Sequence, residues 1–350
     1  MFSILHISAH NASNAGDIFL NESVHKLFDK TLGGIEWATF DIQKLCTEKD
    51  IGFFNKYDAI IVGGGGHIAI SSFYTKEETG WSLGLTNEVL QQLKPKLINY
   101  AIGYNLFGGQ VMNNDVFTCN MSNVIDRSDF FSLRHKGDIG KLKNVVGDKD
   151  IKFNFCSSMV SHPFIPNDNG AIAFQFAWDA VEKRFGSTVK ADEFIRNMGD
   201  IAEHFTNKGA KLYLVSHTNR DEPVNADIFR GWEARGINCE RVSLVGADVE
   251  KTADFYYGIN TVFAMRGHSQ MIPLGLGCKV VSLISHDKIK FLLEDLDIEN
   301  TGVEVNDKDF IRKCLHAYDK ALKTDFNSKL DIVRENINGN MDRIRTIMDG

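Results

Sequence analysis

The chain has few of the features that mark proteins other than ordinary globular ones. Only 5 of its 350 residues are proline, and its six cysteines form no C-x-x-C pair and no metal-ligand spacing. No window approaches the roughly 18 apolar residues of a membrane span, and the N-terminus lacks a basic region followed by a long apolar one. The formal charge of −7 argues against binding to nucleic acid. We therefore expect a cytoplasmic protein with reduced, mostly buried thiols. A peripheral membrane contact stays open.

Several catalytic signatures are missing as well. The sequence has no G-x-x-x-x-G-K-[ST] loop, no G-x-S-x-G, no H-E-x-x-H and no calcium-binding loop. We therefore expect neither a bound metal nor a resident cofactor. The length exceeds that of a usual single domain, so two domains are expected.

Short apolar runs alternate with amphipathic segments, which is typical of parallel sheets flanked by helices. Strands are predicted over 2–7, 35–42, 57–62, 96–102, 130–134, 145–155, 171–176, 211–216, 239–244, 261–265 and 279–284. Helices are predicted over 18–28, 83–93, 192–206, 226–234, 248–257, 288–296, 308–322 and 327–348. The pattern favours an α/β protein with two Rossmann-like domains facing a cleft, similar to the GT-B fold. The domains are predicted over 1–166 and 167–325, and a helix over 326–350 is expected to pack back on the first.

The most informative segment is Arg266-Gly267-His268, which directly follows an apolar strand. If the segment stays extended, the two side chains project to the same side. A helix beginning near Ser269 adds backbone N–H groups and the positive end of its dipole, which suits a phosphate or a carboxylate. A simpler interpretation pairs Arg266 with a carboxylate and makes His268 a helix cap.

Two further segments follow predicted strands, where ligands bind in open α/β sheets. Asn14 and Asp17 lie in a polar loop of small residues, and either side chain could instead be a helix cap. Gly63, Gly64, Gly65 and Gly66 come directly before His67. Four glycines after a β-branched run can expose backbone N–H groups to a ligand, and they can equally form a tight turn.

Three other residues are weaker candidates. Arg134 closes a predicted strand and could point into the cleft. His217 ends another strand, where an acid or base and a buried core histidine are both plausible. Trp178 could form a sugar platform, although a core position explains it more simply.

Taken in order, these motifs resemble those of the polysaccharide pyruvyl transferases. The resemblance consists of N-x-G-D at 14–17, D-x-I-I-x-G-G-G at 58–65, S-x-R at 132–134, H-x-x-x-D at 217–221 and R-x-H at 266–268, followed by Gly275 and Lys288. It extends from about residue 14 to about residue 296. His135 stands where the family commonly has an aspartate.

The resemblance implies transfer of pyruvate from phosphoenolpyruvate to two hydroxyls of a sugar, with release of phosphate. Arg266 and the helix at Ser269 would hold an anionic group of the donor, His217 would assist, and Arg134 would be a second anion clamp. His268 would move the proton, and Asp17 would activate a hydroxyl. Asn14, Gly64, Gly65, Gly66 and His67 would hold the acceptor, a sugar or a lipid-linked oligosaccharide.

Two alternatives remain open at this stage. A glycosyltransferase of the same shape would place the diphosphate of a nucleotide sugar against Arg266 and a helix N-terminus. A non-catalytic protein of the same fold would bind a glycan or a nucleotide without turnover.

Overall fold

The fold is taken from a computed structural model that describes residues 1–69, 78–110, 112 and 114–350. The chain divides into two units, and we describe each by itself. Unit 1 contains residues 1–12, 20–157 and 333–350, and unit 2 contains residues 13–19 and 158–332. No helix in the described part of the chain is long and apolar enough to cross a membrane.

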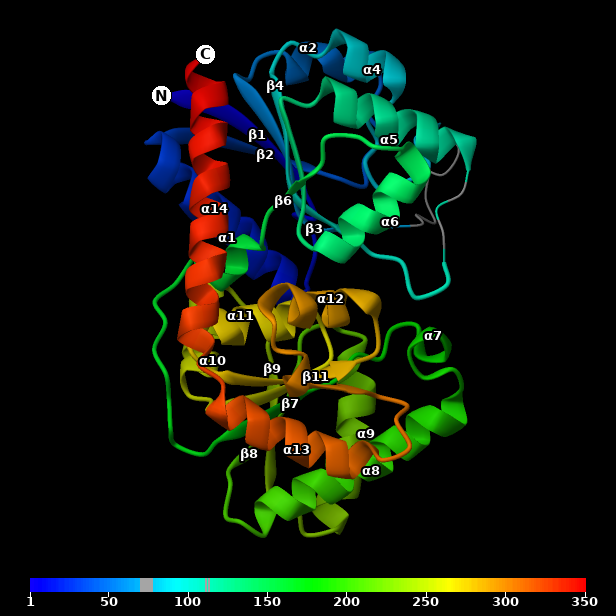
Figure 1. The fold of residues 1–350 in the computed structure, drawn as a ribbon, viewed down its shortest axis with the longest axis vertical. Coiled ribbons are helices and arrows are strands. Elements are labelled where there is room, and N and C mark those ends of the chain that lie inside the picture. Colours follow the sequence, from blue (N-terminus) through cyan, green and yellow to red (C-terminus); the bar gives the residue numbers. More distant parts are fainter. Residues whose placement is uncertain (70–77, 111, 113) are drawn as a thin grey trace. The chain divides into compact units, whose positions relative to one another are not determined.

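Unit 1 is built on a six-stranded parallel sheet in the order β2-β1-β3-β4-β5-β6. Its strands are β1 (Phe2–Ser8), β2 (Ile35–Asp41), β3 (Ala59–Ile68), β4 (Lys96–Tyr104), β5 (Phe130–Leu133) and β6 (Lys152–Phe153). The apolar start of β3 is buried on both faces, as expected when helices cover both sides of a parallel sheet. Figure 1 shows helices flanking this sheet. They are α1 (Ala15–Leu32), α2 (Ile51–Phe54), α4 (Asn87–Gln92), α5 (Asp115–Arg127) and α6 (Lys136–Val146).

Unit 2 contains a second six-stranded parallel sheet, in the order β12-β11-β10-β7-β8-β9. Its strands are β7 (Ile172–Gln175), β8 (Leu212–Ser216), β9 (Cys239–Ser243), β10 (Thr261–Ala264), β11 (Lys279–Ile284) and β12 (Gly302–Glu304). Its helices are α7 (Val181–Phe185), α8 (Thr188–Thr206), α9 (Asp221–Ala234), α10 (Val249–Tyr257), α11 (His268–Leu276), α12 (Asp287–Leu296) and α13 (Phe310–Lys323). Counted within the unit, the strand order is that of the Rossmann fold.

Two long helices belong to both units. Helix α1 begins in unit 2 and continues in unit 1, and α14 (Phe326–Asp349) does the same near the other end of the chain. Within unit 1, Asn336 fixes α14 to the segment after β6. Its side chain accepts a hydrogen bond from the backbone N–H of Phe155 at 2.9 Å and donates one to the carbonyl of Phe153 at 3.2 Å.

The predicted α/β class is confirmed, because the strands form two six-stranded parallel sheets. Two element predictions are wrong. Residues 145–155 were predicted as one strand, but α6 continues to Val146 and only Lys152–Phe153 forms β6. A helix was predicted over 83–93, but α4 begins only at Asn87, where the side chain of Thr86 accepts a hydrogen bond from the N–H of Val89 and caps it. In both places the local apolar pattern does not indicate where the helix cap lies or how far strand pairing extends.

The glycine run is part of strand β3 rather than an exposed loop after it, which corrects the prediction. Gly63, Gly64 and Gly65 all have positive φ angles, of 144°, 66° and 136°. A Cβ atom on Gly63 would lie 2.1 Å from the carbonyl oxygen of Tyr100 on β4. The glycines therefore allow two strands to approach closely at an irregularity in their register. A role in binding an acceptor stays a prediction.

We predict that Gly63→Ala lowers the free energy of unfolding of unit 1 by about 3 kcal/mol, because the new methyl group meets backbone and the φ angle disfavours alanine. Gly34→Ala is the matched control, since no atom lies within 4 Å of its added Cβ. Urea unfolding of the two variants checks this. Equal stability of the two would show that β3 and β4 can separate at no cost.

Candidate anion-binding site

Most of the singled-out residues meet at the carboxyl end of the second sheet. Strands β7 and β10 are neighbours there, with Gln175 paired to Ala264, and the strand order reverses between them. Such a switch point is where open α/β sheets bind ligands. Polar residues follow three adjacent strands at this edge: Asp179 after β7, Asp221 after β8 and Arg266 after β10.

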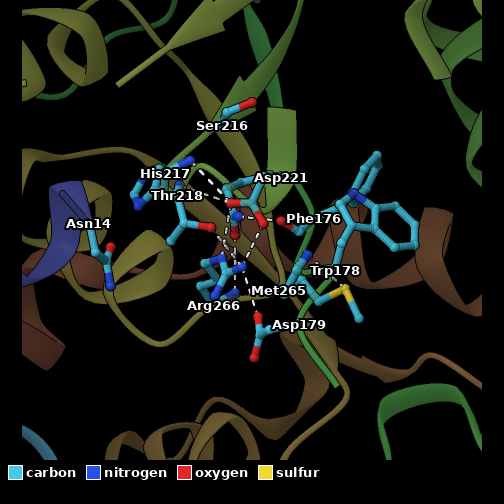
Figure 2. A network of polar contacts seen from close by, with 12 residues as sticks. Asn14, Phe176, Trp178, Asp179, Ser216, His217, Thr218, Asp221, Met265 and Arg266 are labelled. Atoms are coloured by element: carbon cyan, nitrogen blue, oxygen red, sulfur yellow. Dashed lines mark hydrogen bonds and ion pairs between the residues drawn. The ribbon is translucent and has the colours of Figure 1, made fainter. Parts of the chain in front are cut away.

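Arg266 is held by two carboxylates. Its Nη2 atom lies 2.5 Å from Oδ1 of Asp221 and 2.8 Å from Oδ1 of Asp179, and its Nε donates to Oδ2 of Asp221 at 3.1 Å. Figure 2 shows the guanidinium among these groups, with Thr218 beside them. The backbone N–H of Arg266 donates to the side-chain oxygens of Gln175 and Ser269, at 3.1 and 3.0 Å. Both the backbone and the guanidinium of Arg266 are therefore fixed in place.

Asp221 is fully buried and is fixed by its own loop. Its Oδ2 atom accepts hydrogen bonds from the backbone N–H groups of His217 and Thr218, at 3.2 and 3.1 Å. This arrangement folds the β8–α9 connection back on the first residue of α9. The carboxylate thus joins the ends of β8 and β10.

Asp179 lies between two arginines. Arg184 reaches its Oδ2 atom at 2.7 Å, and Arg266 reaches the other oxygen. Burial alone would raise the pKa of Asp179, but the positive charges of Arg266, Arg184 and Lys288 hold it well below its usual range. Three cationic side chains therefore lie close to Asp179. Such a cluster of cations suits an anionic ligand.

His268 lies against the first turn of α1, which follows the loop after β1. Its Nδ1 atom is 3.7 Å from Oδ1 of Asp17. A Cβ atom on Gly16 would lie 2.5 Å from that of His268, so only glycine allows this approach. The loop is held in unit 2 by the hydrogen bond from the N–H of Ala15 to the carbonyl of His217 at 3.1 Å. Asn14 donates to Oδ2 of Asp17 at 2.9 Å, which orients that carboxylate.

The Arg266-Gly267-His268 segment is not extended, contrary to expectation. Gly267 has φ and ψ angles of −54° and −53°, and His268 is already the first residue of α11. Because the backbone turns at Gly267, the side chains of Arg266 and His268 have different partners. Arg266 contacts the carboxylates of Asp179 and Asp221, and His268 approaches Asp17.

His217 and Trp178 are core residues in this structure. The ring of His217 is fully buried, and its Nε2 atom lies 2.6 Å from the hydroxyl of Tyr256. Burial lowers the pKa of His217 to about 4, so the ring is neutral at pH 7. Trp178 donates to Asn225 at 3.2 Å and stacks with Phe185. These contacts favour the simpler interpretation of both residues.

The predicted residues fall into two groups. Unit 2 brings together Asn14, Asp17, His217, Arg266, His268 and Ser269. Unit 1 contains Gly64, Gly65, Gly66, His67 and Arg134. The sequence analysis missed Asp179 and Arg184. Asp179 could have been found, because it follows a predicted strand by only a few residues; Arg184 carries no local signal.

No protein-family model and no curated protein sequence matches the chain. Solved structures do resemble it in fold. A glycosyltransferase from Rickettsia africae matches with a TM-score of 0.59 at 10% identity, covering 99% of this chain and 97% of its own. Anabaena HepE, in complex with UDP and glucose, matches with a TM-score of 0.54 at 11% identity over 100% of both chains. The UDP-GlcNAc 2-epimerase of Methanocaldococcus jannaschii, in complex with UDP-GlcNAc and UDP, gives 0.53 at 12% identity over 95% of this chain and 99% of its own.

These likenesses show that the chain has a GT-B-like fold, as expected from the sequence. They concern the fold alone. The resemblance to pyruvyl transferases stays a prediction.

We predict that Asp221→Asn lowers the free energy of unfolding of unit 2 by about 3 kcal/mol, because the mostly buried Arg266 loses one of its two carboxylate partners. The matched control is Asp227→Asn on the same helix, an exposed residue paired with Arg230, for which a loss below about 1 kcal/mol is expected. Urea unfolding measures both. Similar losses would mean that the buried ion pair contributes no more than a surface one.

The pH dependence of stability provides a separate test of His217. Its pKa in the folded protein, about 4, lies below the ordinary 6.5, so the unfolded chain binds more protons between these values. Stability is therefore lost as the pH falls from 6.5 towards 4. His217→Gln should reduce this slope by up to about 1.4 kcal/mol per pH unit. His316→Gln, at an exposed position of α13, should leave the slope unchanged. Identical slopes for the wild type and His217→Gln would contradict the assignment.

Proposed function

We propose that the chain is a glycosyltransferase that binds the phosphate groups of a nucleotide-sugar donor at the switch point of the second sheet and transfers the sugar to a glycan acceptor. One observation carries this proposal: Arg266, Arg184 and Lys288 lie together near Asp179, and Arg266 comes two residues before α11 begins. A diphosphate needs both cations and backbone N–H groups, and the first turn of a helix provides the latter.

The comparisons support the choice of a nucleotide sugar. HepE holds UDP and glucose, and the M. jannaschii epimerase holds UDP-GlcNAc and UDP, on folds similar to this one. In this chain, the paired arginines would stabilise the negative charge that grows on the leaving diphosphate. Because Arg266 and Arg184 are already fixed by Asp179, they need no rearrangement during the reaction.

His268 and Asp17 supply the proton chemistry in this proposal. The acceptor hydroxyl attacks the anomeric carbon, the bond from that carbon to the phosphate oxygen breaks, and the ring of His268 takes the hydroxyl proton. The Asp17 carboxylate, 3.7 Å from Nδ1, stabilises the imidazolium that forms.

A second candidate, pyruvyl transfer from phosphoenolpyruvate, is favoured by a different observation. The N-x-G-D and R-x-H motifs, which are far apart in the sequence, meet at His268 and Asp17. In this reaction His268 protonates the terminal carbon of the donor, one sugar hydroxyl adds to the neighbouring carbon, and a second hydroxyl displaces phosphate. The same cations would bind the carboxylate and the phosphate.

A donor panel separates the two candidates. The purified chain is incubated with UDP-, GDP- and dTDP-sugars or with phosphoenolpyruvate, each with a set of galactoside and mannoside acceptors. Release of a nucleoside diphosphate with a glycosyl mass gain supports the first candidate. Release of inorganic phosphate with an acid-labile pyruvyl gain supports the second and overturns the first. Binding of a donor without any product would favour a non-catalytic protein of this fold.

With the active donor, His268→Gln should lower kcat about 100-fold or more and leave the KM of the donor within about threefold. Gly16→Ala should lower kcat as well, because its methyl group displaces the ring of His268 without removing a reacting group. The control is Gly231→Ala, where the added atom meets nothing within 4 Å. If Gly16→Ala matched Gly231→Ala in rate, the position of His268 would not matter and its catalytic role would be lost.

A further inference from the structure

Unit 1 contains a buried arginine with two nitrogen atoms that lack a hydrogen-bond partner. Arg134 follows β5 at its carboxyl end and is only 3% exposed. Within the described part of the chain, its Nε and Nη1 atoms are buried and have no hydrogen-bond partner. Arg266 in unit 2 differs sharply, because two carboxylates bind it.

The surroundings of Arg134 do not replace a partner. The nearby carboxylate of Asp138 accepts a hydrogen bond from the backbone N–H of Tyr104 at 3.0 Å. Burial raises the pKa of Asp138, and the neighbouring His135, the N–H of Tyr104 and the charge of Arg134 only partly oppose that shift. Another titratable neighbour is His67, whose pKa falls to about 4 through burial and through the charge of Arg134. Near neutral pH this ring is uncharged and cannot pair with the guanidinium.

The chain makes room for the guanidinium. A Cβ atom on Gly103 of β4 would lie 2.5 Å from Nε and 2.7 Å from Cζ of Arg134. Only glycine therefore lets the planar group lie against the strand. A buried cation without a partner costs several kcal/mol of folding free energy. Stability therefore does not explain why an arginine is buried here.

One of the residues near Arg134, His67, lies at the switch point of the first sheet. The order of strands reverses between β1 and β3, where Ser8 ends β1 and His67 lies near the end of β3. Oγ of Ser8 is 3.4 Å from Nε2 of His67, and that nitrogen donates to the carbonyl of Gly64 at 3.1 Å. Ligands bind at such points in open sheets.

We propose that unit 1 holds a second anion-binding site, in which Arg134 binds an oxyanion, the carboxylate or phosphate group of a sugar. The inference rests on the proposed function in one respect, since it makes this sugar the acceptor. A bound oxyanion would accept hydrogen bonds from the unpartnered nitrogens of Arg134. A guanidinium binds a carboxylate or a phosphate through two parallel hydrogen bonds.

The test exploits the cost of the unpaired charge. Arg134→Met should raise the melting temperature of the ligand-free protein by about 2 °C or more, because it replaces a buried charge with an apolar side chain of similar length. The same variant should lose at least about tenfold in affinity for glucuronic acid, glucose 1-phosphate or both, measured by titration calorimetry. A structural arginine would give the opposite change in stability.

The probes and controls identify the source of any effect. Glucose serves as the neutral probe, and the difference between glucuronic acid and glucose 1-phosphate tells a carboxylate from a phosphate. Gly103→Ala should weaken binding of the same probe by displacing the guanidinium, whereas Arg343→Gln, an exposed change of equal charge on α14, should not. UDP binding, which tests unit 2, should be unchanged in Arg134→Met.

Three results would overturn the proposal: no binding of either anionic probe to the wild type, equal binding to Arg134→Met, or a lower melting temperature of that variant. Loss of UDP binding in Arg134→Met would also overturn it, because Arg134 would then serve the donor. Failure of the donor panel with intact probe binding would instead reject the proposed reaction and leave the anion site standing.

Discussion

The ion pairs of Arg266 with Asp221 and Asp179 are the interactions on which unit 2 depends most. They tie together the segments that follow β10, β8 and β7, three strands that the chain reaches about 40 residues apart or more. Each carboxylate is also held by further groups, Asp221 by its own loop and Asp179 by Arg184. Because Asp221 is fully buried and Arg266 is mostly buried, the loss of one partner leaves the charge of the other uncompensated. The same rigidity presents fixed cations at the edge of the sheet.

Close approach at glycine is a second constraint, and it acts in both units. Gly16 lets the first turn of α1 contact His268, Gly63 lets β3 approach Tyr100, and Gly103 makes room for Arg134. In each place a methyl group would meet another atom at under 3 Å. The glycines therefore position charged or aromatic neighbours rather than provide flexibility, and this explains how glycine runs can occur inside a buried sheet.

The two units treat positive charge differently. Unit 2 pairs Arg266 and Arg184 with carboxylates, and this cluster of cations next to α11 is suited to a phosphate-bearing donor. Unit 1 buries Arg134 with two nitrogen atoms that have no partner among the described residues, at a cost in stability that a bound anion would offset. Compensated cations favour a rigid, preformed site, and an uncompensated one favours a ligand that brings its own charge.

The sequence by itself determined the α/β class, most of the strands and the places where polar residues follow them, because alternating apolar runs and strand ends are local patterns. It also singled out Arg266, His268 and Asp17. Only the tertiary structure decided that Arg266 pairs with Asp179 and Asp221 while His268 approaches Asp17, and that the glycine run lies inside β3. The physical reason is distance along the chain: pairing between segments many residues apart depends on strand order and packing, which no local pattern encodes.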